Sequence, residues 1–288
     1  MPTPTIQLNA ISVTYPNGHM AIDGISATLP GGRICGLIGM NGSGKSTLFK
    51  CMMGFLNPTS GSVLINNGPV NHALKRNQVA YVPQADDIDW DFPILVDDVV
   101  LMGRYTRMGP MRIPTAQDRA CADQALDRVG MTAYRNRQIG ELSGGQKKRV
   151  FVARALAQEA PIILLDEPFT GVDNTTESTL TDLFQTLRKS GHLIIVSTHN
   201  LGSVPAFCDT VMLINQRLLA YGETATTFTR PNLEMAFGGM LRHHQIEPST
   251  IHRDSDHRSV TVLTDDERPV VFYGDDQNWD LVEQQAKE

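Results

Sequence analysis

Residues 39–47, GMNGSGKST, match the pattern G-x-x-x-x-G-K-[ST], which is typical of a loop that binds phosphate. Its glycines let backbone N–H groups turn inward around phosphate oxygens, and a following helix directs its positive end at the same oxygens. The Lys45 ammonium can pair with the β- and γ-phosphates of a nucleotide, and the Ser46 hydroxyl can bind Mg²⁺. A glycine-rich turn that only caps a helix is the alternative. The predicted nucleotide contacts in this loop are Gly39, Met40, Asn41, Gly42, Ser43, Gly44, Lys45, Ser46 and Thr47.

Two neighbouring carboxylates, Asp166 and Glu167, lie at the end of the apolar sequence IILLDEP, residues 162–168. Such a sequence is typical of a buried parallel strand whose tip carries the acid. In phosphoryl transfer one carboxylate can hold Mg²⁺ while another residue orients the attacking water. We therefore expect Asp166 to bind Mg²⁺ and Glu167 to activate water. An acidic strand end before a proline turn is common alone, but the phosphate-binding loop favours the catalytic interpretation.

These chemical groups need strands and helices that hold them in place. Residues 34–38 are a short apolar run suited to a buried strand, so the order strand, glycine loop, helix is predicted around the phosphate loop. Residues 162–166 predict a second buried strand. At 288 residues the chain has room for one large α/β domain with an appendage, or for two small domains.

The pentapeptide LSGGQ, residues 142–146, distinguishes among the many nucleotide hydrolases that share the first two motifs. With these motifs in this order, the chain resembles the ATP-binding subunits of ABC transporters over roughly residues 6–230. The resemblance implies an α/β fold of the P-loop NTPase type, with a mixed β/α nucleotide-binding core. It also implies a helical subdomain at about residues 88–155 and a small C-terminal β appendage. The implied activity is ATP hydrolysis, with ATP and Mg²⁺ bound.

Several residues outside the phosphate loop receive roles from this resemblance. It implies that Tyr15 stacks on adenine, that Gln84 reaches Mg²⁺ and the attacking water, and that His199 contacts the γ-phosphate. Without the resemblance, Tyr15 would be interpreted as an aromatic residue at a strand end, and His199 as a histidine at a strand end whose hydrogen bonds are made within the protein. Family members close a head-to-tail homodimer around two ATP, in which Asp173 touches the opposite subunit. The residues implied to cover the partner copy's nucleotide are Ser143, Gly144, Gly145 and Gln146.

Three positions depart from the family pattern without removing a group that the chemistry needs. Lys148 stands where many relatives have Gln, and we expect it mainly to add charge at the start of a helix. TGVD, residues 170–173, replaces the more usual SALD and keeps the aspartate in place. Asn200 follows His199 where Asp is common, so the side chain keeps nearly the same shape but loses one negative charge.

The acidic and aromatic sequence DDIDWDFP, residues 86–93, begins the segment implied to form the helical subdomain. Its aspartates are hard oxygen ligands, but it lacks the glycine and the distal Glu of a calcium loop. Core packing of Trp90 and Phe92 is a second alternative. The resemblance implies that this subdomain receives a short helix of a membrane-spanning permease, so we favour contact with the permease near Trp90 and Phe92, where aromatic side chains supply contact area at modest entropic cost. The apolar residues that follow and fit a helix with one buried side are Ile94, Val96, Val99, Val100 and Met102.

The sequences DWDFP, VLMGRY, EPFTGVD and LSGGQKKRV narrow the resemblance to bacterial importers for manganese, iron and zinc. The sequence LTDDERPVVFYG near the end of the chain resembles the iron and manganese branch. This implies a peripheral subunit at the cytoplasmic face of the inner membrane, paired with a permease and indirectly with an extracytoplasmic metal-binding protein. The alternatives are transport of another solute, such as an iron chelate, and a soluble ABC ATPase. The soluble kind usually has two nucleotide sites or a coiled-coil insertion, and this sequence has one site and no sustained heptads.

Composition excludes several other classes. The net charge of −6 and the lack of a basic excess argue against nucleic acid as a partner, and no apolar run approaches the ~20 residues of a membrane helix. The four cysteines are scattered, as is typical of free thiols in a reducing compartment. Residues 241–288 contain 5 Lys or Arg and 11 Asp or Glu, so they carry the whole net charge. We therefore expect an ABC ATPase domain at residues 1–240 and an acidic tail at 241–288.

Within the tail, residues 258–274 predict two short strands around a DDER turn, which would form a β-hairpin. Upstream of this hairpin, metal sensing and a solvated polar linker are both open interpretations. The four histidines on which metal sensing would depend are His243, His244, His252 and His257.

Overall fold

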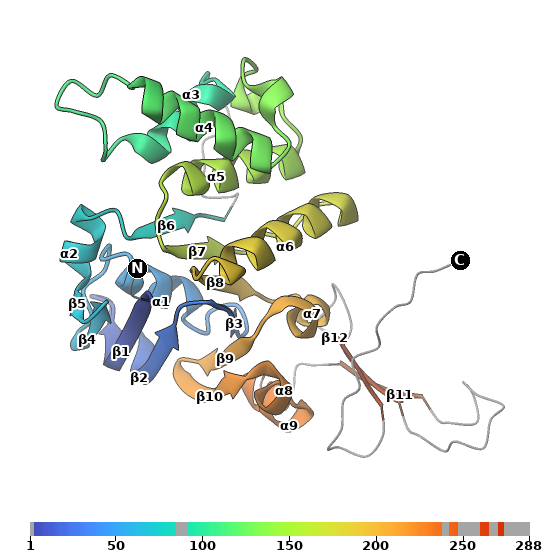
Figure 1. Cartoon of the computed structure of the whole chain (residues 1–288). Helices are drawn as coiled ribbons and strands as arrows, with labels where there is room; N and C mark the ends of the chain where they lie inside the picture. The colour runs from blue at the N-terminus through green and yellow to red at the C-terminus, as the bar shows by residue number, and fades with distance from the viewer. Residues whose placement is uncertain (1–2, 85–91, 238–241, 247–259, 265–269, 274–288) are drawn as a thin grey trace.

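The computed structural model describes residues 3–84, 92–237, 242–246, 260–264 and 270–273 (Figure 1). Its larger sheet has six strands in the order β10-β9-β3-β8-β7-β6, of which the last five are parallel and β10 is an antiparallel edge. The parallel strands are almost wholly apolar because both faces of the sheet are covered. The strands are β3 (Arg33–Ile38), β6 (Val79–Val82), β7 (Ile162–Asp166), β8 (Leu193–Thr198), β9 (Thr210–Asn215) and β10 (Arg217–Glu223).

A second, antiparallel sheet covers one face of the first, with helix α1 (Lys45–Met52) between them. Side chains of α1, of the second sheet and of alternate main-sheet positions, such as Leu164 and Ile195, form one buried cluster. The second sheet has the strand order β2-β1-β4-β5. Its strands are β1 (Thr5–Thr14), β2 (Met20–Pro30), β4 (Ser60–Ile65) and β5 (Gly68–Pro69), and the short helix α2 (Val70–Lys75) follows.

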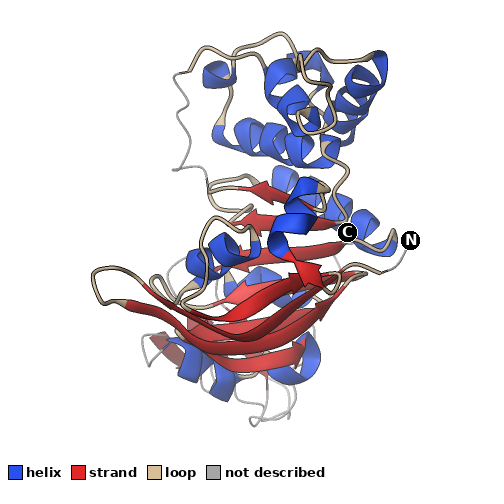
Figure 2. Ribbon diagram, turned by 90° about the vertical axis from the view of Figure 1, so that its left-hand side faces the viewer, coloured by secondary structure: helices blue, strands red, loops and turns tan. Residues whose placement is uncertain are grey.

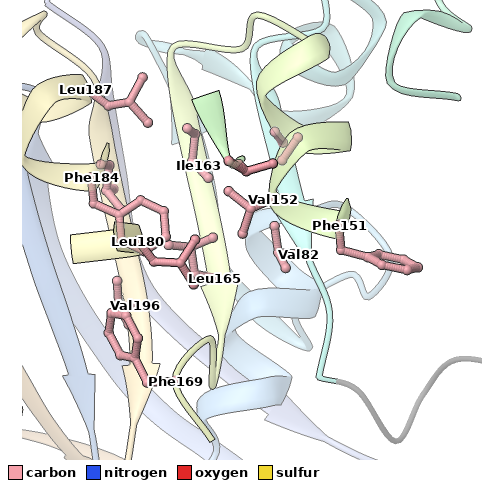
Figure 3. Close-up of a cluster of buried hydrophobic side chains, with 14 of the residues drawn as sticks. Val82, Phe151, Val152, Ile163, Leu165, Phe169, Leu180, Phe184, Leu187 and Val196 are labelled. Atoms are coloured by element: carbon pink, nitrogen blue, oxygen red, sulfur yellow. The ribbon is translucent and has the colours of Figure 1, made fainter. Parts of the chain in front are cut away.

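The opposite face of the main sheet packs against helices α5 (Gly144–Ala157) and α6 (Asn174–Lys189). Ile163 and Leu165 of β7 point to this side, because successive side chains of a strand alternate between its faces. Figure 3 shows them with side chains of both helices, including Val152 of α5. The remaining helices near this sheet are α7 (Val204–Phe207), α8 (Thr224–Thr227) and α9 (Arg230–Phe237).

The chain between β6 and β7 forms a layer of helices, which we call the helical subdomain, residues 96–157. Figures 1 and 2 show it at one end of the molecule, with the strands at the other. Its helices α3 (Val96–Leu101), α4 (Ala116–Arg128) and α5 pack on one another. Val96, Val99 and Val100 are buried as expected, whereas Met102 is 47% exposed. The expectation for Met102 is wrong because α3 tightens there into a 3₁₀ turn, Met102–Arg104, which changes the direction of its side chain.

A buried ion cluster joins the helical subdomain internally. Arg104 is only 4% exposed, and its Nε donates to Asp118 Oδ1 at 3.1 Å. Its Nη1 donates to Glu159 Oε2 at 2.6 Å and to the Ala157 carbonyl at 2.8 Å. The cluster therefore ties the end of α3, the start of α4 and the end of α5 together.

All four cysteines are buried and free, which predicts a slow reaction with thiol reagents. Burial raises the pKa of Cys35 to about 12 and that of Cys51 to about 11, and it also raises the pKa of Cys208. These thiols stay protonated at pH 8 and lack the reactive thiolate form. We expect Ellman's reagent at pH 8 to leave native protein unlabelled within minutes and to label every cysteine in denaturant. Rapid labelling of Cys35 or Cys208 in native protein would contradict this packing.

The tail contributes a third, antiparallel sheet with the order β11-β12-β13. β12 (Val260–Thr264) pairs with β13 (Val270–Tyr273), as the sequence of the predicted hairpin suggests, and β11 (Arg242–Ile246) adds a strand that was not predicted. Several features discussed from the sequence lie outside the described residues, namely Trp90, the aspartates at 86–91, His252, His257 and the DDER turn. Among the residues that the structure describes, no helix is long and apolar enough to cross a bilayer.

Candidate nucleotide site

A cavity of about 560 Å³ lies where the parallel strands β3, β6, β7 and β8 end. Its volume falls within the range of small-molecule sites, about 300–1,000 Å³. The cavity brings together residues that are up to 184 positions apart in the chain, from Tyr15 to His199. The predicted site residues that line it are Tyr15, Met40, Asn41, Gly42, Gly44, Lys45, Ser46, Thr47, Gln84, Glu167 and His199. His19, Ala21 and Thr170 line it as well and were not predicted.

The glycine loop leads directly into helix α1, which starts at Lys45. Among the described residues no side chain caps this helix and its first turn has no acid, so no acid of its own offsets the positive end of the helix. Gly44 has a φ of 101°, and a Cβ there would lie 2.7 Å from the Ala21 carbonyl oxygen. Lys45 Nζ donates to the Gly39 carbonyl at 2.6 Å and to the Met40 carbonyl at 3.0 Å. The loop is therefore folded into a concave anion site.

The aromatic end of the cavity is formed by the turn between β1 and β2. The Tyr15 hydroxyl lies 3.1 Å from Thr47 Oγ1, which fixes the ring beside the loop. The rings of Tyr15 and His19 are nearly parallel, at 6°, with centroids 6.5 Å apart. A flat base can stack on such a surface.

The Asp166 carboxylate is held by the strands on both sides of β7. Ser197 of β8 donates to Oδ1, and the Tyr81 hydroxyl of β6 donates to Oδ2 at 3.3 Å. Burial raises the pKa of Asp166, while these two hydrogen bonds and the positive charge of Lys45 oppose the rise. Each oxygen can still accept a further bond or bind a cation, because a carboxylate oxygen has two lone pairs. Asp166 itself is 5% exposed and does not line the cavity.

Glu167 faces the cavity from a backbone conformation that non-glycine residues seldom adopt. Its φ is 48°, in the left-handed region, and conformations of this kind cost on the order of 1–3 kcal/mol. Its N–H donates to Ser197, to the carbonyl at 3.2 Å and to Oγ at 3.1 Å. His199 Nδ1 lies 3.1 Å from Glu167 Oε1, and this hydrogen bond is the main cause of a lowered Glu167 pKa. The carboxylate is thus ionised and available as a proton acceptor at neutral pH.

Seven predicted nucleotide contacts do not line this cavity, and five of them belong to LSGGQ or precede α6. Ser143 caps α5, and it exchanges hydrogen bonds with Gln146, at 3.3 Å to Ser143 Oγ and 3.0 Å to Gln146 Oε1. A Cβ on Gly145 would lie 3.5 Å from Asp173 Oδ1, so the start of α5 packs near the start of α6. Ser143, Gly144 and Asp173 are exposed. The predicted contacts that do not line the cavity are Gly39, Ser43, Ser143, Gly144, Gly145, Gln146 and Asp173.

Four residues that bind Asp166 or Glu167 were not predicted as part of the site. Tyr81 and Ser197 hold the Asp166 carboxylate, and Thr170 Oγ1 donates to Glu167 Oε2 at 3.4 Å. Lys148, expected mainly to add charge, donates from Nζ to the Glu167 carbonyl at 3.0 Å and to the Thr170 carbonyl. The expectation for Lys148 therefore left out its main contacts. Tyr81 lies three residues before Gln84, and Ser197 lies two residues before His199, but only the pairing of β6, β7 and β8 reveals that both bind Asp166.

Comparison with known proteins identifies the class of protein that this fold and site define. A family model described as ABC transporter matches residues 22–170, and the chain belongs to that family. It is an ABC ATPase that couples ATP hydrolysis to transport, and the predicted fold class is confirmed.

Two curated relatives are similar over most of their length. The chain is 58% identical over 285 residues to the chelated iron transport system membrane protein YfeB of Yersinia pestis, covering 99% of this chain and 96% of that protein. It is 55% identical over 247 residues to the manganese transport system ATP-binding protein MntA of Synechocystis, covering 85% and 95%. A solved metal-chelate type ABC transporter in an inward-facing conformation matches with a TM-score of 0.74 and 27% identity, covering 94% and 98%.

Proposed function

We propose that this chain drives a bacterial importer for manganese or iron from the cytoplasmic face of the inner membrane. The observation that carries the proposal is the 58% identity to a chelated iron transport protein across 99% of the chain, which includes the acidic tail. The manganese relative extends the same similarity to a second metal. Both are consistent with one ATP-hydrolysing subunit design serving closely related cargoes.

The functional unit in this proposal is a head-to-tail homodimer that encloses two ATP. The exposed residues Ser143 and Gly144 lie outside the cavity of their own chain, where they cannot cover the nucleotide bound there. A second copy would supply them across a symmetric interface. Covering the γ-phosphate would exclude water and strengthen each electrostatic contact to it.

We further propose that Mg²⁺ accompanies ATP, held by Ser46, Gln84 and Asp166. These residues offer hydroxyl, amide and carboxylate oxygens, which are the ligands that Mg²⁺ prefers. When bound, the ion would neutralise phosphate charge. Glu167 would accept a proton from the attacking water, and His199 would orient Glu167 through the bond to Oε1. Lys45 would pair with the phosphates.

Tyr81→Phe tests how the Asp166 carboxylate is held. Loss of the hydroxyl frees Oδ2, so we expect the Mg²⁺ concentration for half-maximal ATPase activity to rise about tenfold, a typical effect of removing a group that orients a metal ligand. Mn²⁺ binding in the presence of ATP, followed by electron paramagnetic resonance, should weaken in parallel. Tyr105→Phe is the matched control, because Tyr105 is 52% exposed in the helical subdomain. An unchanged Mg²⁺ requirement would contradict this role of Tyr81.

The proposed permease contact lies at the entrance to the helical subdomain, near Trp90 and Phe92. Phe92 is 60% exposed, and Leu95 and Met102 nearby in the chain are also exposed, at 37% and 47%. Exposed apolar side chains of this kind favour a partner. An extracytoplasmic metal-binding protein would act on the other side of the permease without touching this chain.

Uptake of radiolabelled manganese, iron and zinc tests the function. Cells would express this chain with its candidate permease and binding protein, with Glu167→Gln as the inactive variant and Glu234→Gln, on the distant helix α9, as the matched control. We expect uptake of manganese or iron that Glu167→Gln abolishes and Glu234→Gln preserves. If Glu167→Gln leaves the uptake of all three ions at the wild-type level, the metal assignment is refuted. An iron chelate should be included as a fourth cargo, because the similar protein YfeB belongs to a chelated iron transport system.

A further inference from the structure

Lys148 is the fifth residue of α5, in the amino-terminal part of that helix. The side chain is half-buried and leaves its own helix, because Nζ reaches the carbonyl oxygens of Glu167 and Thr170. Both acceptors belong to the loop that follows β7. Lys148 is thus a bridge between α5 and the catalytic loop.

The backbone conformation of Glu167 requires stabilising contacts from other elements. Its left-handed φ of 48° persists only if the surroundings over-determine it. Ser197 binds the N–H on one side of the residue, and Lys148 binds the carbonyl on the other side. The two contacts come from different elements, β8 and α5, so the conformation of the catalytic residue depends on where α5 lies.

The same helix carries the residues that would cover the second nucleotide. Ser143 and Gln146 are joined to the first turn of α5 by reciprocal hydrogen bonds, and Lys148 lies less than one turn further along. This series of contacts therefore links Ser143 and Gln146, which would lie against the partner's ATP, to Glu167, which would activate water at the ATP of its own chain.

We propose that Lys148 is a positioning residue that fixes the Glu167 backbone relative to the LSGGQ end of α5 and so couples the two ATP sites. The coupling rests on the proposed homodimer, whereas the positioning of Glu167 holds within one chain. Lys148 does not touch substrate in this scheme. It acts through the Glu167 and Thr170 carbonyls.

The test uses the full chain with Lys148→Met, which keeps the length and apolar stem but removes the donor. Lys148→Arg restores a charged donor, and Lys147→Met is the matched control one residue away on the same helix. Hydrogen exchange of residues 167–173 without nucleotide reports the bridge directly, and steady-state kinetics report its effect on kcat, KM and the Hill coefficient for ATP.

We expect Lys148→Met to speed exchange in residues 167–173 and to lower kcat about tenfold, as for loss of one hydrogen bond from a charged donor, with KM within about twofold. The Hill coefficient should fall toward one. Lys148→Arg should recover kcat to within about threefold, and Lys147→Met should resemble the wild type. Unchanged exchange in Lys148→Met, or an effect on KM alone, overturns the proposal.

A further arm separates this inference from the proposed function. ATP-dependent dimerisation is measured by size-exclusion chromatography in protein that carries Glu167→Gln, with and without Lys148→Met. Absence of dimers in both proteins would refute the dimer and with it the coupling, while exchange in the nucleotide-free chain still decides the positioning. Dimers in both, with an unchanged Hill coefficient in Lys148→Met, would overturn the coupling alone.

Discussion

Replacing Glu167 with Gln is expected to lower the kcat of ATP hydrolysis by about 10²–10⁴-fold, the usual contribution of a general base. The amide keeps the size of the side chain but cannot accept the proton of the attacking water. ATP affinity should stay within about threefold, because the glycine loop and Lys45 that would hold the phosphates are untouched. Phosphate release and equilibrium binding of a fluorescent ATP analogue measure the two quantities.

The pH dependence provides an internal check on this assignment. The hydrogen bond from His199 lowers the Glu167 pKa below its ordinary value of 4.5, so the carboxylate remains ionised across the neutral range. Titration of Glu167 should therefore cause no loss of kcat between pH 8 and pH 6. If Glu167→Gln retains more than about a tenth of the wild-type kcat, another group activates the water.

Replacing Arg104 with Met is expected to reduce the free energy of unfolding by about 3–5 kcal/mol, which is the typical cost of breaking a buried ion pair by removing one partner. Asp118, about as buried as Arg104, would lose its cationic partner, and the Ala157 carbonyl would lose a donor. Methionine fills much of the same space, so the effect is chiefly electrostatic. Urea denaturation followed by circular dichroism measures it.

Arg107 provides a matched control that shares an acceptor with Arg104. Its Nη1 lies 3.6 Å from the same Glu159 Oε2, but its side chain is 43% exposed. Arg107→Met should therefore cost less than about 1 kcal/mol, as exposed ion pairs usually do. Equal losses for the two variants would mean that charge balance on the surface, rather than burial, stabilises the helical subdomain.

Most of the nucleotide site was predictable because its chemistry is local in sequence. The phosphate loop, the strand ending in Asp166 and Glu167, and the identity of Lys45 follow from short patterns whose geometry depends on adjacent residues. The contacts of Tyr81, Ser197 and Lys148 were not predictable in the same way. Each depends on strand or helix pairing between segments at least 19 residues apart, for which the sequence provides no spacing rule.

The elements of the fold also divide into those that were predictable from local sequence and those that were not. Buried strands 34–38 and 162–166 were visible as apolar runs, whereas Met102 was misplaced because a 3₁₀ turn interrupts the periodicity of its helix. Strand β11 could not be recognised, since RHHQI has little of the β-branched character typical of strands. Its hydrogen bonds to β12 supply what its sequence lacks.

The adjacency of β6 and β7 also has a consequence for the folding and adaptability of the chain. These strands pair, Val79 with Ile162, although roughly 80 residues separate them, so the sheet must close a long loop. The entropy of closure grows only with the logarithm of length, and doubling that loop would cost about 0.6 kcal/mol. Extra residues at an exposed turn such as the one around Gly109 would barely alter the stability of the sheet. The helical subdomain can therefore acquire insertions, and new partners with them, while the ATPase core keeps its register.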